Sequence, residues 1–134
     1  MSAIGPTAAA EHVLLVLDDD SAVRDSLKFS LEIEGFEVRV YSSANELLSE
    51  DTLPPFSCLI VDYYMPAMNG LELVAELRHR RISIPAILIT THPNEGLRES
   101  AAAAGVPIVE KPLLGGRLLD CIRDMLDREN KSSR

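Results

Sequence analysis

The stretch Val13-Leu14-Leu15-Val16-Leu17-Asp18-Asp19-Asp20 places an apolar run directly before three aspartates. A short apolar run that ends in turn-forming residues is typical of a buried strand in a parallel sheet. The same arrangement recurs at residues 58–61, which precede Asp62, and at residues 106–109, which lie shortly before Lys111. Ligands of open α/β sheets bind at the carboxyl ends of the strands. We therefore expect these aspartates and Lys111 to surround a single pocket.

Helix-like segments separate the apolar runs, so strand and helix alternate along the whole chain. Short loops and right-handed crossovers then favour a parallel sheet that is covered by helices on both faces. We predict an α/β fold with a five-stranded sheet in the flavodoxin-like order 2-1-3-4-5. In that order the first and third strands are neighbours, so Asp18, Asp19 and Asp62 would flank the crevice between them. The expected strands are residues 13–17, 36–40, 58–61, 86–89 and 106–109, and the expected helices are residues 21–34, 43–50, 71–80, 95–104 and 113–126.

The length of 134 residues is enough for one domain of ordinary size. Hydrophobic residues make up 46% of the chain and aromatic residues only 4%, so the core must be mainly aliphatic. We assign residues 12–127 to this domain, residues 1–11 to a flexible leader and residues 128–134 to a flexible tail. The leader is rich in alanine and has no basic segment, so it does not resemble a secretory signal peptide.

The net charge of -8 at pH 7 restricts the partners of this chain. Nucleic-acid surfaces need clustered Lys and Arg to contact phosphates, so we expect no direct binding of nucleic acid by this domain. No apolar stretch is long enough to span a bilayer. We therefore expect a cytoplasmic protein that does not bind membranes.

The expected pocket has a chemistry that suits phosphoryl transfer. Carboxylates crowded in one crevice repel one another unless one is protonated or a cation joins them, and an all-oxygen site with room for water suits Mg²⁺. A carboxylate such as Asp62 can attack phosphorus and form an aspartyl phosphate. Lys111 would neutralise one phosphoryl oxygen, and Thr90, after the fourth apolar run, would donate a hydroxyl group to another.

Each of these features alone has a simpler explanation. Asp20 is better explained as a helix cap, Thr90 as a capping residue after a strand, and Lys111 with Pro112 as part of a loop. The occurrence of suitable residues at four strand ends, in the expected order, is what favours a site.

Together, the motifs resemble the receiver domain of bacterial two-component response regulators. The resemblance covers about residues 13–126. It rests on Leu17-Asp18-Asp19-Asp20, Val61-Asp62-Tyr63-Tyr64-Met65-Pro66, Asn69-Gly70, Ile89-Thr90 and Glu110-Lys111-Pro112. It implies a phosphoacceptor signalling module that receives a phosphoryl group from a sensor histidine kinase or a phosphotransfer protein. Such a module is not an enzyme in the ordinary sense, because it catalyses only its own phosphoryl transfer and dephosphorylation.

The resemblance also implies roles for particular residues. Asp62 would accept the phosphoryl group, and Thr90 and Lys111 would hold the phosphoryl oxygens. The peptide bond between Lys111 and Pro112 is expected to be cis, as proline permits.

By the same resemblance, Mg²⁺ would be the cofactor. Asp19 and Asp62 would bind it directly, Asp18 would act largely through water, and the backbone carbonyl of Tyr64 would be a further ligand. Phosphorylation would alter binding to an unknown output protein, or to an effector domain if this chain is a piece of a longer regulator. A homodimer would form through the fifth strand and the last helix.

Three departures from the family pattern affect these expectations. Thr91 is bulkier than the small residue that often follows the threonine, and Ile108 stands where an aromatic residue is usual. The coupled movement of threonine and aromatic residue therefore cannot operate in its usual form. Tyr64 is also bulky for its position, and we expect it to shield the acyl phosphate and set its lifetime.

Two alternative functions remain open. Asp18 and Asp20 reproduce the Asp-x-Asp spacing of phosphatases that resemble the haloacid dehalogenase superfamily, but this interpretation leaves Asp62 and the Met65-Pro66 segment unexplained. The other alternative is a pseudo-receiver, a binding scaffold that works without phosphorylation. Ile108 and Thr91 favour it, whereas the full set of phosphorylation residues argues against it.

Overall fold

The computed structural model describes residues 12–113 and 116–132, so the expected leader at residues 1–11 lies outside the described part. Five parallel strands form one sheet in the order β2-β1-β3-β4-β5. This confirms the predicted fold class and strand order. The strands are β1 (Val13–Leu17), β2 (Glu37–Tyr41), β3 (Ser57–Asp62), β4 (Ala86–Thr90) and β5 (Ile108–Glu110).

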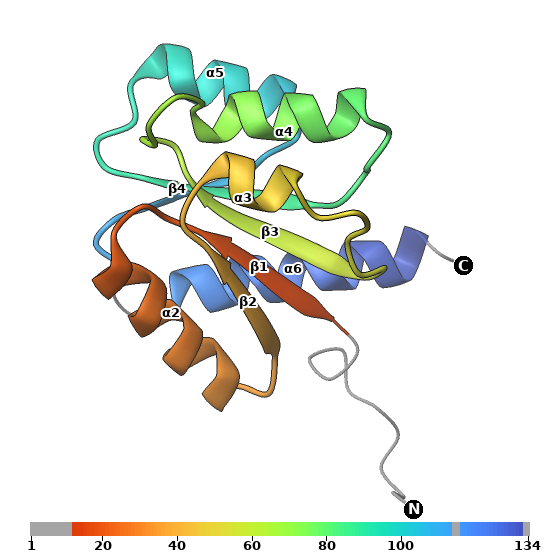
Figure 1. The fold of residues 1–134 in the computed structure, drawn as a ribbon. Coiled ribbons are helices and arrows are strands. Elements are labelled where there is room, and N and C mark those ends of the chain that lie inside the picture. Colours follow the sequence, from red (N-terminus) through yellow and green to blue (C-terminus); the bar gives the residue numbers. More distant parts are fainter. Residues whose placement is uncertain (1–11, 114–115, 133–134) are drawn as a thin grey trace, which may run out of the picture.

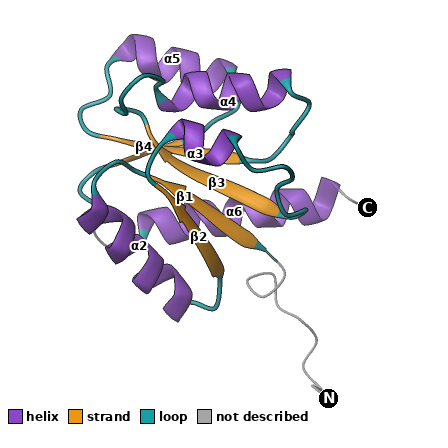
Figure 2. Ribbon diagram, viewed as in Figure 1, coloured by secondary structure: helices purple, strands orange, loops and turns teal. Residues whose placement is uncertain are grey.

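Helices cover both faces of the sheet (Figures 1 and 2). Helices α3, α4 and α5 lie on one face, and α2 and α6 lie on the other. The helices are α2 (Ser21–Ile33), α3 (Ala44–Leu48), α4 (Gly70–His79), α5 (Glu95–Ala103) and α6 (Arg117–Ser132).

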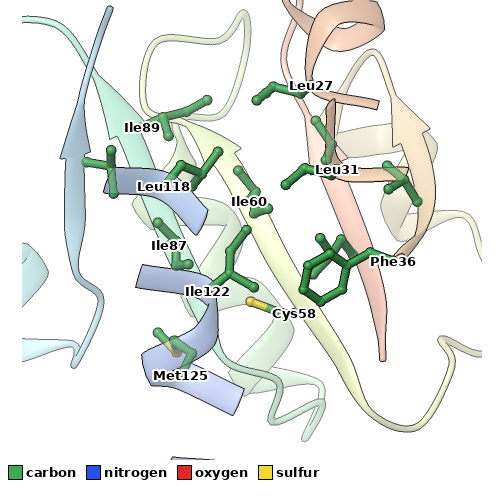
Figure 3. Packing of buried hydrophobic residues seen from close by; sticks show 14 of the residues in the cluster. Leu27, Leu31, Phe36, Cys58, Ile60, Ile87, Ile89, Leu118, Ile122 and Met125 are labelled. Atoms are coloured by element: carbon green, nitrogen blue, oxygen red, sulfur yellow. The ribbon is translucent and has the colours of Figure 1, made fainter. Parts of the chain in front are cut away.

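Alternate side chains of the central strands pack into two separate hydrophobic cores, one on each face of the sheet. Leu14 and Val16 of β1 pack against α2 and α6, while Leu15 and Leu17 pack against α3 and α4. Figure 3 shows the first of these cores, in which Ile60 of β3 lies among side chains of the neighbouring strands and helices. Every residue of β3 is buried, as expected for the middle strand of a covered sheet. The sheet is therefore a rigid platform for the loops at its carboxyl edge.

The helix ends follow the capping chemistry in the sequence. Asp20 caps α2 as predicted, because its side chain accepts hydrogen bonds from the backbone of Ala22 and Val23. Gly35, just past the end of α2, has a φ of 103°, which glycine adopts without strain. Ser43 caps α3, because its hydroxyl accepts a hydrogen bond from Glu46 N. The Glu46 carboxylate accepts a hydrogen bond from Ser42 N rather than from Ser43 N.

The last strand and helix differ from their predicted limits. β5 begins at Ile108 instead of residue 106, because Pro107 has no N–H to donate to the ladder and contributes only its carbonyl to Leu88 N. α6 begins at Arg117, directly after Gly116, since glycine is a poor helix former. It continues to Ser132, so residues 128–132 of the expected tail are helical. The apolar periodicity stops at Leu126 and could not indicate that extension.

Within the described ranges, the longest apolar segments are too short or too polar for any helix to cross a membrane.

Candidate functional site

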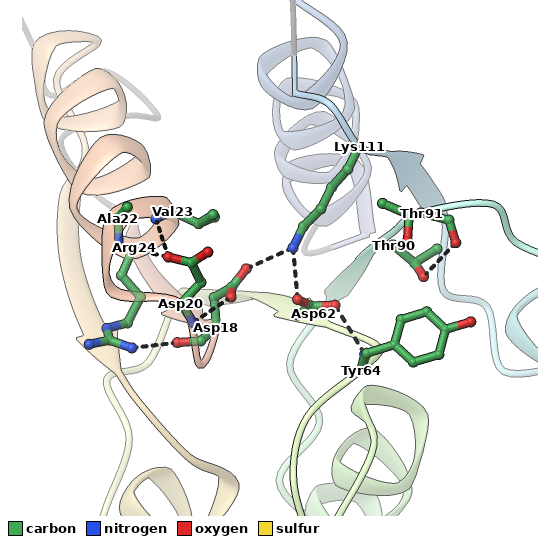
Figure 4. A network of polar contacts seen from close by, with 10 residues as sticks. All are labelled: Asp18, Asp20, Ala22, Val23, Arg24, Asp62, Tyr64, Thr90, Thr91 and Lys111. Atoms are coloured by element: carbon green, nitrogen blue, oxygen red, sulfur yellow. Dashed lines mark hydrogen bonds and ion pairs between the residues drawn. The ribbon is translucent and has the colours of Figure 1, made fainter.

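Four strand ends bring the predicted site residues to one edge of the sheet. Asp18 directly follows β1, Asp62 ends β3, Thr90 ends β4 and Lys111 directly follows β5. Figure 4 shows Lys111 reaching between the two aspartates from the end of β5. Because β1 pairs with β3, the acids that are far apart in the sequence become neighbours across the crevice.

Asp18 is fully buried at the bottom of this crevice. Its Oδ1 accepts a hydrogen bond from Asp20 N at 2.9 Å, and its Oδ2 lies 3.1 Å from Lys111 Nζ. Burial is the largest influence on this carboxyl group and raises its pKa, and the nearby charge of Asp62 raises it further. The hydrogen bond from Asp20 N and the ammonium group of Lys111 oppose the rise without cancelling it.

Asp62 is also buried and is held at both carboxylate oxygens. Oδ1 accepts from Tyr64 N at 3.0 Å, and Oδ2 accepts from Lys111 Nζ at 2.8 Å. The side chain is therefore fixed in orientation by the loop that follows it and by the end of β5.

Lys111 supplies a single ammonium group to these two carboxylates. Its partial burial lowers its pKa, but hydrogen bonds to Asp62 and Asp18, together with their charges, outweigh burial and raise the pKa above its usual value. The amine is therefore protonated at neutral pH. Burial, with the added charge of Asp62, therefore keeps the pKa of Asp18 raised even though Lys111 is beside it.

Asp19 completes the acidic cluster from the exposed side. One carboxylate oxygen from each of Asp18, Asp19 and Asp62 lies within 4.8 Å of the others. Three carboxylates, two buried and one open to solvent, form the kind of oxygen donor set that suits Mg²⁺ with bound water. These side chains fit the ion that the sequence resemblance implies.

Thr90 and Tyr64 are placed near the acids but make different contacts from those of Lys111. Thr90 is fully buried, and its hydroxyl donates to the carbonyl of Thr91 at 3.4 Å rather than to Asp62. Tyr64 is 56% exposed, and its ring packs edge-on against that of Tyr63, with ring centroids 4.9 Å apart. The roles of the Thr90 hydroxyl and of the Tyr64 carbonyl remain predictions. The peptide bond between Lys111 and Pro112 is cis, as expected.

Gly70, for which the sequence predicts no role at the site, lies against the backbone of Asp62. A Cβ atom at this position would lie 2.8 Å from the carbonyl oxygen of Asp62 and 2.6 Å from Leu88 Cδ1. Gly70 N also donates to Tyr63 O at 3.1 Å. A glycine shortly after the acidic strand end was the available signal, because glycine permits close backbone approach.

Arg24 is a second supporting residue without a predicted role, and its Nη1 donates to the backbone carbonyl of Asp18 at 2.7 Å (Figure 4). A side chain that binds a backbone carbonyl leaves no periodic pattern in the sequence, so this contact could not be predicted.

The response regulator receiver domain family matches residues 14–123 of this chain. The transcriptional regulatory protein FixJ of Bradyrhizobium diazoefficiens is 34% identical over 116 residues, which cover 84% of this chain and 56% of that protein. A crystal structure of FixJ-N superposes with a TM-score of 0.79 at 32% identity, covering 87% of this chain and 94% of that one. A CheY-like receiver domain from Methanospirillum hungatei gives a TM-score of 0.81 at 30% identity, with coverage of 90% and 98%.

The chain belongs to the receiver domain family of two-component response regulators. It spans a little over half the length of FixJ and of several other curated relatives that it matches.

Proposed function

We propose that this chain is a phosphoacceptor signalling module of the cytoplasm, which receives a phosphoryl group on Asp62 in a Mg²⁺-dependent reaction. The donor would be the phosphohistidine of a sensor histidine kinase or of a phosphotransfer protein. The single observation that carries the proposal is the contact of Lys111 Nζ with Asp62 at 2.8 Å and with Asp18 at 3.1 Å. That contact joins the acceptor, the acidic cluster and a phosphate-binding cation in one pocket.

The proposed reaction needs little beyond positioning and charge neutralisation. A carboxylate oxygen of Asp62 attacks phosphorus, the phosphorus–nitrogen bond to the donor imidazole breaks, and its electron pair stays on the ring nitrogen. Lys111, which donates to the Asp62 carboxylate before the reaction, would then donate a hydrogen bond to a phosphoryl oxygen instead. The fixed contact from Tyr64 N orients the carboxylate before the attack.

The acidic cluster would hold the metal in this proposal. Asp18, Asp19 and Asp62, with the carbonyl of Tyr64, would be the protein ligands. When bound, Mg²⁺ would neutralise charge on the phosphoryl oxygens. The acidic cluster and Lys111 would also support hydrolysis of the acyl phosphate. The module would therefore catalyse its own dephosphorylation and would not turn over a separate substrate.

The output would be a change in partner binding. Phosphorylation of Asp62 at the end of β3, beside Thr90 at the end of β4, would bias the position of α5 and of the face formed by β5 and α6. The partner would be a separate output protein or an effector domain, and FixJ carries the name of a transcriptional regulator. We also propose that a homodimer forms through β5 and α6.

The function is tested by incubating the protein with acetyl phosphate and Mg²⁺ and measuring the intact mass. We expect a gain of one phosphoryl group that is absent in Asp62→Asn. Asp51→Asn is the matched control, because Asp51 is an exposed aspartate outside the pocket.

Other outcomes of the same experiment would support the alternatives. An unmutated protein that gains no mass would favour a phosphorylation-independent scaffold. Steady release of phosphate from a phosphate ester, without a stoichiometric limit, would favour an aspartate-nucleophile phosphatase.

A further inference from the structure

The side chain of Arg24 holds the backbone of the loop that carries Asp18, Asp19 and Asp20. Its Nη1 donates to the carbonyl oxygen of Asp18 at 2.7 Å, and its own backbone N donates to Asp20 O at 3.0 Å. The carbonyl that Arg24 binds belongs to the peptide between Asp18 and Asp19. A charge-assisted hydrogen bond of this length strongly restrains the rotation of that peptide.

The location of Arg24 is unfavourable for the helix that carries it. Arg24 is the fourth residue of α2, close to the end where the helix dipole is positive and where an acidic residue would stabilise the helix. The Asp20 carboxylate caps this end of α2, but the first turn itself contains no acidic residue. A cation at this position is therefore explained better by its contact with the Asp18 carbonyl than by helix stability.

Asp19 depends on the backbone for its orientation. Asp18 and Asp62 are buried, and their carboxylates are held by hydrogen bonds. The Asp19 side chain is exposed and, in the described part of the chain, its carboxylate has no hydrogen-bond partner. The direction of this carboxylate is therefore set mainly by the peptide that Arg24 fixes.

We propose that Arg24 is a positioning residue, which locks the peptide between Asp18 and Asp19 and so directs the Asp19 carboxylate towards a divalent cation. This role rests on the proposed function, because it presumes that the acidic cluster binds Mg²⁺. Arg24 acts through the loop and does not touch the ion.

The direction in which Mg²⁺ affinity changes when Arg24 is replaced separates a positioning role from a simple electrostatic one. Arg24 carries a positive charge close to a cation site, so the loss of its charge alone would tighten Mg²⁺ binding. The loss of positioning would weaken Mg²⁺ binding, because the flexible Asp19 carboxylate would have to be ordered on binding. The two explanations therefore predict opposite changes in the dissociation constant.

The test measures Mg²⁺ affinity by isothermal titration calorimetry in the absence of any phosphodonor. Arg24→Met should raise the dissociation constant about tenfold, the usual size of the loss when a residue that supports a metal ligand is removed. Arg24→Lys keeps the charge and one donor group, so its dissociation constant should lie between those of the unmutated protein and Arg24→Met. Arg39→Met is the matched control, because it removes the charge of an exposed arginine on β2 and should leave the affinity almost unchanged.

A second measurement separates positioning from a general structural defect. The rate of labelling by acetyl phosphate in Arg24→Met should approach the unmutated rate at saturating Mg²⁺, with only the half-saturating Mg²⁺ concentration increased. Equal or tighter Mg²⁺ binding by a folded Arg24→Met protein would overturn the role of Arg24 alone. Failure of the unmutated protein to bind Mg²⁺ would overturn the proposed metal-dependent function and this role with it.

Discussion

Two acids and one lysine share the pocket, and this imbalance should appear in the pH dependence of stability. Burial and the charge of Asp62 raise the pKa of Asp18 above 3.8, so the folded state favours the protonated form of this acid. Ionisation of Asp18 therefore destabilises the fold. The penalty is absent below pH 3.8, grows as the pH rises from 3.8 to the raised pKa, and is constant above it.

Asp18→Asn should consequently stabilise the metal-free protein at pH 7 by about 1 kcal/mol, because it keeps the shape of the side chain without the charge. The measurement is urea unfolding in EDTA from pH 3.5 to 8. The gain should shrink as the pH falls, since the unmutated Asp18 then becomes neutral as well. A gain that stays constant with pH, or a loss of stability at pH 7, would show that ionised Asp18 is favourable in the fold.

Gly70 makes a second residue-scale prediction, because its contact with Asp62 is with backbone. The Cβ atom of Gly70→Ala would meet the Asp62 carbonyl at 2.8 Å, and backbone cannot move aside as a flexible side chain does. We expect a loss of about 2 kcal/mol in the free energy of unfolding and slower labelling of Asp62.

The control for Gly70→Ala is Gly96→Ala in α5. Its added Cβ would meet Asn94 Oδ1 at 3.5 Å, which is an ordinary contact. This variant should be slightly more stable, by about 0.5 kcal/mol, because alanine favours helix over glycine. If both variants behave alike, the close approach at Gly70 does not matter.

The size of the Tyr64 side chain leads to a prediction about the lifetime of the phosphorylated protein. Tyr64 is exposed and its backbone N donates to Asp62, so we expect its side chain to restrict the access of water to an acyl phosphate on that residue. Tyr64→Ala should shorten the lifetime of the phosphorylated protein severalfold, as measured by the decay of the phosphorylated mass after removal of donor. Tyr64→Phe keeps the ring and should behave like the unmutated protein, whereas an unchanged lifetime in Tyr64→Ala would remove the idea of shielding.

At the scale of elements, the pattern of apolar runs predicted every strand and helix but not their ends. The central strands are uninterrupted apolar runs, so their positions were clear from residues 13–17 and 58–61 alone. The limits of β5 and α6 depended on the missing N–H of Pro107 and on a polar helical extension after Leu126. Hydrophobic periodicity carries no information about either feature.

Helix α5 presents few buried side chains to the sheet. Only Leu97 and Ala101 of this helix are buried. Arg78 of α4 binds its C-terminal end through a hydrogen bond from Nη1 to Ala104 O at 2.6 Å, and Arg98 forms an ion pair with Glu110 at 2.7 Å. These polar contacts supplement the two buried side chains in keeping α5 in place.

Loss of the contact from Arg78 should loosen α5 selectively. In Arg78→Met, amide hydrogen exchange over residues 95–103 should accelerate about fivefold, while exchange in α2 should not change. Arg81→Met is the control, because Arg81 is a neighbouring exposed arginine whose side chain makes no hydrogen bond or ion pair with the described residues. Equal exchange in the two variants would show that Arg78 does not restrain α5.

At the scale of the molecule, the site was predictable as a set of residues but not as a set of contacts. The order 2-1-3-4-5 followed from the alternation of strand and helix, and it placed Asp18, Asp19, Asp62 and Lys111 together. The supporting contacts of Arg24 and Gly70 depend on backbone positions that exist only after the chain has folded. The hydroxyl contact of Thr90 with Thr91 likewise depends on a rotamer that no sequence pattern specifies.

The molecule as a whole is acidic, yet the face of β5 and α6 carries both signs of charge. Arg117 of α6 and Arg98 of the adjacent α5 line a pocket of about 450 Å³ there, together with acidic residues. The acidic residues of this face are Glu110, Asp120 and Asp124. A surface with both signs can complement a second copy of itself about a two-fold axis, which is how most homodimers form.

We therefore expect phosphorylation to produce a dimer through this face. Sedimentation velocity should show a monomer without phosphodonor and a dimer after complete labelling, and Asp62→Asn should stay monomeric under both conditions. Arg117→Glu should weaken the labelled dimer at least tenfold, because it breaks the charge complementarity of the face. Arg39→Glu makes the same change in net charge on β2, at the opposite edge of the sheet, and should leave the dimer intact. A fully labelled protein that remains monomeric would refute the dimer without affecting the role of Asp62 as phosphoacceptor.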